Sequence, residues 1–477
     1  MRIDQVAPAD SDLAAPLARV VRRRLGVEGV EGLRRLSGGA SQETWSFDAL
    51  RGDERLELIL RRAPGGGRGA TALSPAAEAR LQRVARAAGV PAARVWFELE
   101  PEDQLGDGYV MERVAGETIA RRILRDDQFA AARLGLAREC GRVLGRIHGV
   151  PLAEVSWLDI ADGGRQLERY QSLYRGLEEP RPLFDLAFAW LSRRLTPCKE
   201  TCLVHGDFRN GNLVVGGDGL RAVLDWELAH RGDRYEDLSW ICVNSWRFGE
   251  VANPVGGFGS YQDLFAGYLE ETGHGVDESR LRLWEVFGTL KWGVMCLMQG
   301  FSYLAGNARS VEKAAIGRRV SETEVDLARL LARGPLDGVA AAETSLPERS
   351  WGRSERPGIL DLVTAVREQL DAEARSSPPG SGAFQRRVAS NALGIVEREL
   401  RDGPRVEREE AERLRAFVES GSDGVRGLNA ALCERIRAGD ADLDTPGLLA
   451  HLARTAEEKL RIDNPRYRPL PWPPAPG

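Results

Sequence analysis

The chain has 477 residues, of which 43% are hydrophobic and 29% charged, the mixture of an ordinary globular protein rather than a fibrous or disordered one. The formal net charge of -5, without long runs of one sign, argues against nucleic acid as a partner. Six scattered cysteines are too few for a disulfide framework, so we expect a reducing, cytoplasmic setting. The chain begins without a secretory signal, and its most apolar stretch, residues 292–304, is too short to span a bilayer, so we expect no membrane association.

The first third of the chain predicts a small mixed sheet with one helix packed on it. Residues 34–60 contain two or three short segments that alternate or run apolar, separated by turns. Ser74 is a suitable cap for a helix that begins at the following proline and ends before Gly89. Residues 94–98 and 108–114 are further strand candidates.

Most of the remaining chain has helical spacing. Residues 126–194 predict helices, but residues 203–226 interrupt the helical pattern with strand-like sequence. Farther along, Ser321 and Glu324 form a predicted capping box for a helix that runs to Leu331.

These patterns predict an α+β protein with an additional helical domain. Its expected parts are an N-terminal helical segment (1–32), a β-rich lobe (33–115), a helical lobe (116–333), a proline-broken linker (334–358), an all-helical C-terminal domain (359–463) and a proline-rich tail (464–477).

The strand-like segment carries the chemistry. Two apolar runs flank the turn sequence Gly-Gly-Asp-Gly and predict a β-hairpin. If Val215 faces Leu220, then Asn212 and Asp225 meet at the open end of the hairpin, and Asp207 can turn back toward them from an irregular loop. Oxygen donors without histidine or thiolate suit Mg²⁺ that is held partly by substrate phosphates.

The same segment resembles the catalytic core of the aminoglycoside phosphotransferase and choline kinase-like superfamily. The similar motifs are His205-Gly206-Asp207 with Asn212, then Asp225-Trp226-Glu227, and then Gly232-Asp233 with Asp237-Leu238. Arg234 stands where the family usually has proline. The resemblance implies a bilobal protein kinase-like fold with ATP and Mg²⁺ as cofactors.

The resemblance also implies roles for single residues. Asp207 is expected to orient the acceptor hydroxyl and receive its proton, while Asn212 and Asp225 hold Mg²⁺ on the nucleotide phosphates. His205 and Asp237 are expected to support the loop.

Arg209, two residues after Asp207, is expected to neutralise charge on the phosphoryl group during transfer.

For the nucleotide, the small residues after the first strand let backbone amides approach a triphosphate; they are Ser37, Gly38, Gly39 and Ser41. An ordinary hairpin turn is the alternative. Arg61 takes the place of the lysine that many relatives carry, in a chain with no lysine before Lys199. Glu78 is its expected ion-pair partner, or else a solvated helix glutamate.

The last strand of the β-rich lobe resembles the hinge that contacts the nucleotide base. The residues concerned are Met111, Glu112 and Val114. The alternative is that Met111 belongs to the hydrophobic core.

For the acceptor, residues 233–291 mix acidic and basic side chains, which disfavours a polycationic antibiotic. Aromatic walls with one arginine suit an apolar acceptor with an anionic end; the candidates are Trp240, Asn244, Trp246 and Arg247. The alternative for these four is a core helix with one exposed arginine.

Other segments resemble the phosphotransferase domains fused to some acyl-CoA dehydrogenases, and the C-terminal helices resemble an uncharacterised domain found with such kinases. This favours a small-molecule kinase that binds a nucleotide and a hydroxylated substrate, such as a hydroxyacyl-CoA or a hydroxy acid. The alternatives are an aminoglycoside-type antibiotic kinase and a catalytically silent scaffold that binds a partner protein through the C-terminal domain. A protein kinase is disfavoured because no activation loop is recognisable before Asp237.

Overall fold

The computed structural model describes residues 11–36, 42–63, 72–198, 200–307, 310–334, 336, 359–377, 381–419 and 424–474. Contacts group the chain into two compact units, and each unit is assembled from two separate segments. The first unit comprises residues 1–162 and 198–281, and the second comprises residues 163–197 and 282–477. The predicted linker lies almost entirely outside the described residues, and the predicted domain boundaries stay predictions.

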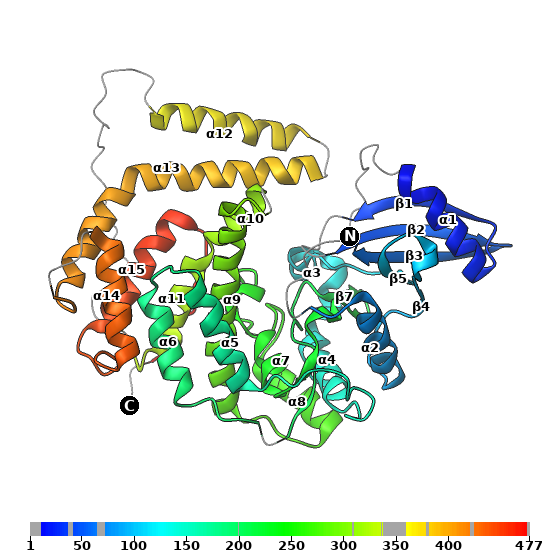
Figure 1. Cartoon of the computed structure of the whole chain (residues 1–477), viewed down its shortest axis with the longest axis horizontal. Coiled ribbons are helices and arrows are strands. Elements are labelled where there is room, and N and C mark those ends of the chain that lie inside the picture. The colour runs from blue at the N-terminus through cyan, green and yellow to red at the C-terminus, as the bar shows by residue number, and fades with distance from the viewer. Residues whose placement is uncertain are drawn as a thin grey trace. The chain divides into compact units, whose positions relative to one another are not determined.

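The first unit contains a five-stranded antiparallel sheet, as the alternating segments predict (Figure 1). In spatial order its strands are β1 (Gly29–Leu36), β2 (Glu43–Arg51), β3 (Glu54–Ala63), β5 (Asp107–Glu112) and β4 (Val95–Glu98).

Helices α1 (Ser11–Leu25) and α2 (Pro75–Ala87) cover opposite faces of this sheet (Figure 1). Leu58 and Leu60 belong to the core on the α1 side, whereas Ile59 belongs to the core on the α2 side. Because side chains alternate along a strand, the residue after Leu60 turns toward α2. The predicted cap of α2 is confirmed, since Ser74 Oγ accepts a hydrogen bond from Ala77 N at 3.1 Å.

Two helices of the first unit, which follow the sheet in the chain, pack closely on each other. In α4 (Ala130–His148) and α8 (Tyr261–Thr272), glycines allow the backbones to touch. A Cβ atom on Gly141 would lie 2.1 Å from Leu264 O, and one on Gly267 would lie 1.9 Å from Arg138 O. Any larger residue at these positions would force the helices apart.

Short elements complete the first unit around the strand-like segment. They are α3 (Ala120–Arg125), β6 (Cys202–Val204), β7 (Leu213–Gly216), β8 (Gly219–Val223), β9 (His230–Gly232) and α7 (Tyr235–Trp240). β7 pairs with β8 as an antiparallel hairpin, and β6 pairs with β9.

The described part of the second unit is helical. It contains α5 (Gly163–Gly176), α6 (Pro182–Ser192), most of α9 (Glu278–Leu304), α10 (Val311–Gly317), α11 (Val320–Leu331), α12 (Ile359–Ser376), α13 (Ser381–Leu414), α14 (Gly424–Ala438) and α15 (Leu448–Asp463). α12 lies along α13, and α14 packs against α6 (Figure 1).

Helix α11 corrects one prediction about local structure. The helix begins at Val320, and Ser321 lies inside it with its hydroxyl donating to Arg318 O at 3.3 Å. No side-chain cap is formed by the N-cap residue, Arg319. The capping box is therefore wrong, because Ser321 and Glu324 are both buried within a helix that starts earlier.

The proline-rich tail lies extended on α11. Tyr467 Oη donates to Asp326 Oδ2 at 2.5 Å, and Leu470 N donates to Asp326 Oδ1 at 2.8 Å. The guanidinium of Arg329 lies 5.0 Å from the ring centroid of Trp472. The tail therefore docks on the protein itself, which the sequence left open.

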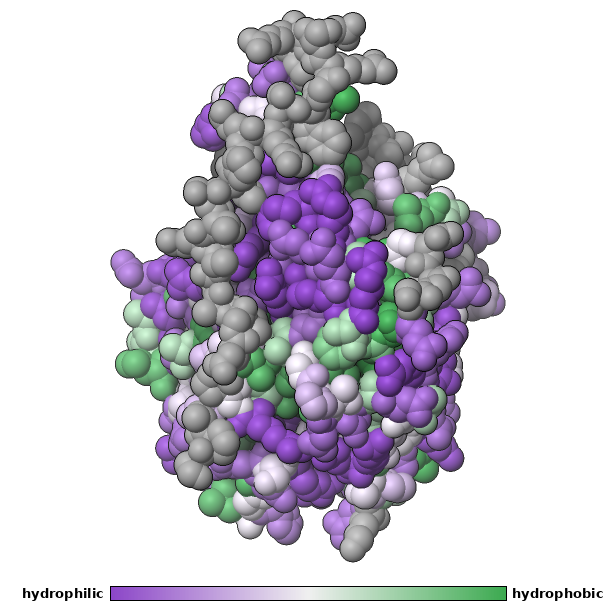
Figure 2. Space-filling model, turned by 90° about the vertical axis from the view of Figure 1, so that its left-hand side faces the viewer, coloured by the Kyte–Doolittle hydropathy of each residue, from purple (hydrophilic) through white to green (hydrophobic). Residues whose placement is uncertain are grey.

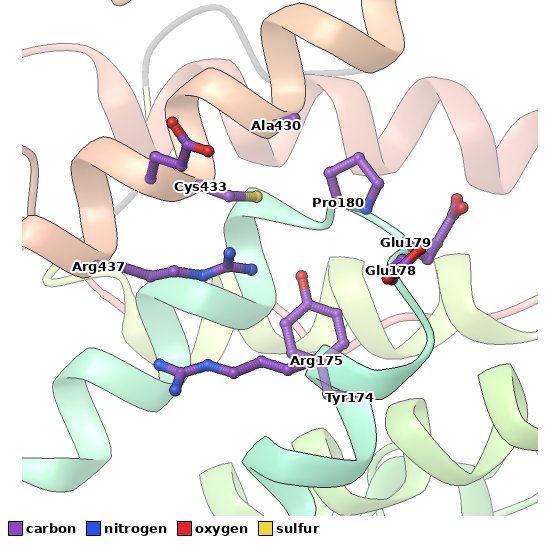
Figure 3. Close-up of a pocket in the computed structure, with 9 residues that line it drawn as sticks. Tyr174, Arg175, Glu178, Glu179, Pro180, Ala430, Cys433 and Arg437 are labelled. Carbon is purple, nitrogen blue, oxygen red and sulfur yellow. The ribbon is translucent and has the colours of Figure 1, made fainter.

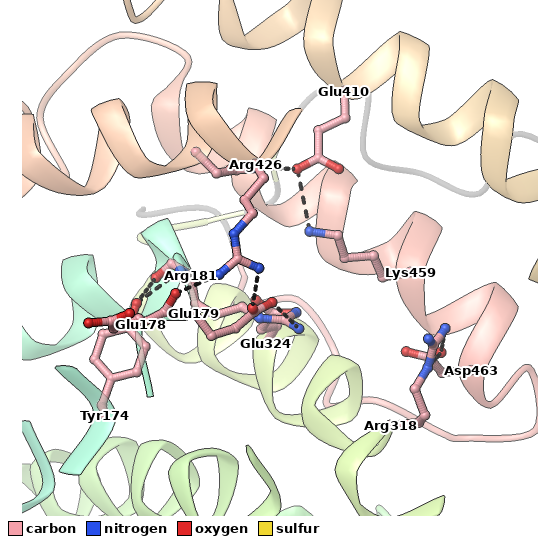
Figure 4. A network of polar contacts seen from close by, with 11 residues as sticks. Tyr174, Glu178, Glu179, Arg181, Arg318, Glu324, Glu410, Arg426, Lys459 and Asp463 are labelled. Atoms are coloured by element: carbon pink, nitrogen blue, oxygen red, sulfur yellow. Dashed lines mark hydrogen bonds and ion pairs between the residues drawn. The ribbon is translucent and has the colours of Figure 1, made fainter. Parts of the chain in front are cut away.

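Polar contacts to Asp185 of α6 come from Arg437 of α14 and Tyr174 of α5. The Asp185 carboxylate accepts Arg437 Nε at 2.7 Å, and its other oxygen accepts Tyr174 Oη at 3.0 Å. Next to this pair, a cavity of about 230 Å³ is lined by Tyr174, Cys433 and Arg437, among others (Figure 3). Further ion pairs, such as Arg181 with Glu324 at 3.2 Å, link the helices of this unit (Figure 4).

Among the described helices, none is both long and apolar enough to cross a membrane. Among the coloured residues in Figure 2 hydrophilic ones predominate, and hydrophobic ones gather across the middle of the view.

Candidate active site

The loop between β6 and β7 holds Asp207 by its side chain. Three side-chain N–H groups donate to the Asp207 carboxylate: Arg209 Nε at 3.0 Å, Asn212 Nδ2 at 2.6 Å and Trp240 Nε1 at 2.7 Å. The Asp207 side chain keeps 14% of its surface exposed. Asp207 is therefore an oriented carboxylate that a small molecule can still reach.

The backbone of this loop is fixed from α7. The two oxygens of Asp237 accept His205 N at 2.7 Å and Gly206 N at 2.9 Å. Gly206 has a φ of +82°, and a Cβ atom there would lie 2.5 Å from Leu228 O, so the turn requires glycine. This is the geometry expected of a support residue at Asp237.

The buried His205 ring connects the loop to the hairpin. Its Nε2 lies 3.1 Å from Leu224 O, and its Nδ1 lies 3.2 Å from Asp207 N. Since a carbonyl accepts and an amide donates, Nε2 carries the proton and Nδ1 accepts. Burial lowers the pKa of His205, which keeps the ring neutral and preserves both bonds.

The open end of the hairpin is arranged as predicted. Val215 pairs with Leu220, which confirms the expected register. Leu224 N donates to Asn212 O at 2.8 Å, so the two strand ends that carry Asn212 and Asp225 lie side by side. Asp225 has a φ of +67°, a left-handed conformation that aspartate tolerates better than most residues.

Arg61 lies between two carboxylates. Its guanidinium forms ion pairs with Glu78 at 3.2 Å and with Asp225. Burial alone would lower the pKa of Arg61, but the two carboxylates raise it, so the group stays charged. Burial would raise the pKa of Asp225, but Arg61 lowers it, so that carboxylate is ionised. Burial raises the pKa of Glu78, which Arg61 opposes only in part.

The donor set fits Mg²⁺ held together with phosphates. Asn212 and Asp225 supply an amide and a carboxylate, both of which are oxygen donors. The charges of Arg61 and Arg209 balance only two of the four carboxylates Glu78, Asp207, Asp225 and Glu227, and a divalent cation would restore neutrality. In the described parts of the chain, no group of three or more His, Cys, Asp or Glu is placed to hold a metal by itself. Phosphate oxygens would have to complete such a site.

The other predicted nucleotide residues are placed as follows. Ser37, Gly38, Gly39 and Ser41 lie outside the described residues. Met111 is buried in β5 against Gln82, in agreement with its core alternative. Glu112 Oε2 accepts Arg94 N at 3.1 Å, and Val114 packs on the core beside α2.

The four predicted acceptor residues are buried, with exposures of 2% for Trp240, 4% for Asn244, 5% for Trp246 and 3% for Arg247. Arg247 donates to Cys242 O at 2.7 Å and to Val251 O at 3.2 Å. Its guanidinium thus holds backbone carbonyls, so it is neither an exposed arginine nor placed to bind the anionic end of an acceptor. The burial of all four side chains corrects the expectation that they form the walls of an acceptor site.

Sequence reasoning missed two residues of the site. Gln42 bridges the central ion pair, accepting Arg61 Nε at 2.9 Å and donating to Glu78 at 3.2 Å. His148 Nε2 lies 3.3 Å from Asp237 and completes its support. The signal for Gln42 is its place immediately before β2, whose first residues pair with the end of β3 that carries Arg61.

Two known protein families match parts of this chain. The model of the family described as "Phosphotransferase enzyme family" matches residues 32–275, and that of a domain of unknown function matches residues 376–467. A solved structure from Ralstonia eutropha, provisionally named an aminoglycoside phosphotransferase, is similar with a TM-score of 0.51 and 22% identity, over 65% of this chain and 95% of the other. The predicted kinase-like fold is thereby confirmed.

Curated relatives are similar over part of their length. The chain is 31% identical to acyl-CoA dehydrogenase family member 10 of Mus musculus over 39% of this chain and 18% of the relative. It is 26% identical to family member 11 of Gallus gallus over 64% of this chain and 41% of the relative. The chain thus spans less than half the length of these relatives.

Proposed function

Because the chain belongs to the phosphotransferase enzyme family, we propose that it uses ATP and Mg²⁺ to phosphorylate a hydroxyl group of a small molecule. The observation that carries this proposal is the Asp207 carboxylate, oriented by three donors beside the paired ends of the hairpin. A silent scaffold has no need of such an arrangement.

In the proposed reaction, Asp207 orients the acceptor hydroxyl and takes its proton as the acceptor oxygen bonds to the γ-phosphorus. The bond between that phosphorus and the bridging oxygen of ADP breaks, and ADP leaves. Arg61 contacts the nucleotide phosphates, and Asn212 and Asp225 would hold Mg²⁺. When bound, Mg²⁺ neutralises charge on the phosphate oxygens.

For the acceptor we propose a hydroxyacyl-CoA or a related hydroxy acid. Support comes from the acyl-CoA dehydrogenase names of the relatives and from the mixed charges of residues 233–291, which do not suit a polycation.

The test is Mg²⁺-dependent phosphate transfer from ATP to a panel of hydroxyacyl-CoAs, hydroxy acids, amino alcohols and aminoglycosides. Asp207→Ala is expected to lower turnover by roughly 10²- to 10⁴-fold with ATP binding preserved. The matched control is Asp218→Ala in the hairpin turn, whose side chain is 71% exposed. Failure of the whole panel, with no nucleotide binding by calorimetry, would favour the scaffold.

A further inference from the structure

Helix α7 contacts the loop of Asp207 at two points. Asp237 accepts two loop amides, and three residues later Trp240 donates to Asp207 Oδ1 at 2.7 Å. Residues three apart lie on one face of a helix, so a single face of α7 holds both the loop backbone and its carboxylate.

The indole of Trp240 is itself held rigidly. Trp240 is 2% exposed, and its ring centroid lies 5.4 Å from that of Trp246. The guanidinium of Arg209 lies 4.6 Å from the Trp246 ring and returns through Nε to Asp207. The side chains of Trp240, Trp246 and Arg209 thus form, with the Asp207 carboxylate, a closed ring of contacts.

The three donors divide unequally between the two oxygens of Asp207. Oδ1 accepts Trp240 Nε1 at 2.7 Å and the shorter contact of Arg209 Nε, at 3.0 Å. Oδ2 accepts Asn212 Nδ2 at 2.6 Å and the longer contact of the same Arg209 N–H, at 3.2 Å. Each oxygen thus has one donor of its own and shares the Arg209 N–H, which lies closer to Oδ1, so Oδ2 is the less fully occupied oxygen.

We propose that Trp240 is a positioning residue for Asp207. Its indole N–H occupies Oδ1 and fixes the carboxylate plane, so that Oδ2 receives the proton of the acceptor hydroxyl. Arg209, by contrast, keeps 25% of its side chain exposed on a long, flexible stem, and Asn212 is needed at the proposed metal. The position of Trp240 is thus fixed by packing. Its role is to orient Asp207 from the buried side, and it does not form a wall of the acceptor site.

This inference rests on the proposed function, and its test compares two tryptophans. Trp240→Phe keeps the aromatic bulk and removes the N–H, and it is expected to lower kcat at least about tenfold while both KM values stay within about twofold, because a hydrogen bond to a charged group is lost. The matched control is Trp45→Phe in β2, which is 4% exposed and also donates to a carboxylate, Glu43 Oε2 at 3.2 Å. It is expected to leave kcat unchanged.

A second measurement reports on the contact without turnover. In protein labelled with ¹⁵N-tryptophan, the indole N–H resonance of Trp240 is identified by its loss in Trp240→Phe. It is expected to shift in Asp207→Ala, whereas the Trp45 resonance stays in place. An unmoved Trp240 resonance, or a kcat within twofold of wild type in Trp240→Phe, overturns the proposal.

The two proposals fail in distinguishable ways. If wild-type protein is active and Asp207→Ala is not, normal activity of Trp240→Phe overturns only the positioning role. If wild-type protein turns over no acceptor, the proposed function fails and the catalytic role of Trp240 fails with it, while the resonance still decides whether the indole holds the carboxylate.

Discussion

Both units bury carboxylates, but they balance them differently. On α11, each buried acid has its own partner: Glu322 has Arg319 at 3.0 Å, Glu324 has Arg181 at 3.2 Å, and Asp326 has the tail. In the candidate site, one guanidinium, Arg61, serves both Glu78 and Asp225.

The difference separates structural pairs from a binding site. A matched buried pair contributes to holding two elements together and leaves no charge for a ligand. A surplus of buried negative charge costs stability, and a bound cation relieves that cost. Substitutions on α11 should therefore mainly lower the free energy of unfolding, whereas substitutions in the candidate site should mainly weaken ligand binding.

The largest effect is expected from Asp225→Ala. Loss of this carboxylate should weaken binding of Mg²⁺-ATP on the order of 100-fold or more, because a metal contact worth several kcal/mol is removed. The free energy of unfolding should fall only modestly: the lowered pKa of Asp225 means that its charge favours the folded protein, but Arg61 keeps Glu78 as a partner. Calorimetry with ATP at varied Mg²⁺, alongside urea unfolding, measures both. Unchanged Mg²⁺ dependence would remove Asp225 from the metal site.

Next in size is Asp326→Ala on α11. It leaves the buried Tyr467 hydroxyl and Leu470 N–H without their acceptor, and we expect a loss of roughly 2 kcal/mol of stability with an unchanged KM for ATP. Urea unfolding measures the loss. Asp444→Ala is the control, because its ion pair with Arg333 is exposed and contributes little. Equal stability of the two variants would contradict the inference that Asp326 holds the tail on α11.

A buried histidine in the second unit makes stability depend on pH. His451 is 5% exposed, and burial lowers its pKa to about 4, with Arg413 adding to the effect. Glu410 opposes this shift, while Lys459 and Arg454 add to it. The unfolded chain therefore binds more protons between about pH 6.5 and pH 4, and stability falls as pH falls through that window.

From pH 6.5 to pH 5 this group should contribute roughly 1 to 2 kcal/mol of the loss. In His451→Leu the free energy of unfolding should fall less between pH 6.5 and pH 5 than in the wild type. Urea unfolding of both proteins at each pH measures this. Parallel curves for wild type and variant would show that His451 binds protons equally in the folded and unfolded chain.

The smallest effect is expected from Glu78→Gln. The amide still accepts a hydrogen bond, and the charge that it removes is one that burial already disfavours, so stability should change by less than about 1 kcal/mol. Glu324→Gln is the matched contrast, because Arg181 then loses a carboxylate that is not in surplus. Thermal unfolding of both variants tests this, and a larger loss at Glu78 than at Glu324 would reverse the comparison.

Local signals in the sequence were sufficient for much of the fold. The turn glycines and apolar runs determine the register of Val215 with Leu220, and Ser74 with its following proline marks the start of α2. These features depend on neighbours in the chain, which periodicity and capping rules describe.

Features set by distant segments were not predictable. The Ser321 capping box failed because α11 already begins at Val320, and Arg247 was expected to bind the acceptor, or alternatively to be exposed, but satisfies the carbonyls of Cys242 and Val251. Similarly, the tryptophan spacing indicated an aromatic cluster but not that Trp240 donates to Asp207. Contacts of this kind arise from tertiary structure and leave no periodic trace.

The pairing of Asp185 with Arg437 has a consequence for synthesis of the chain on the ribosome. The two residues are 252 positions apart, so at about 5 to 20 residues per second α6 emerges roughly 10 to 50 s before its partner α14 exists. During that interval the face of α6 that contacts α14 in the finished protein stays uncovered. The second unit can therefore bury this face of α6 only after most of the chain has been made.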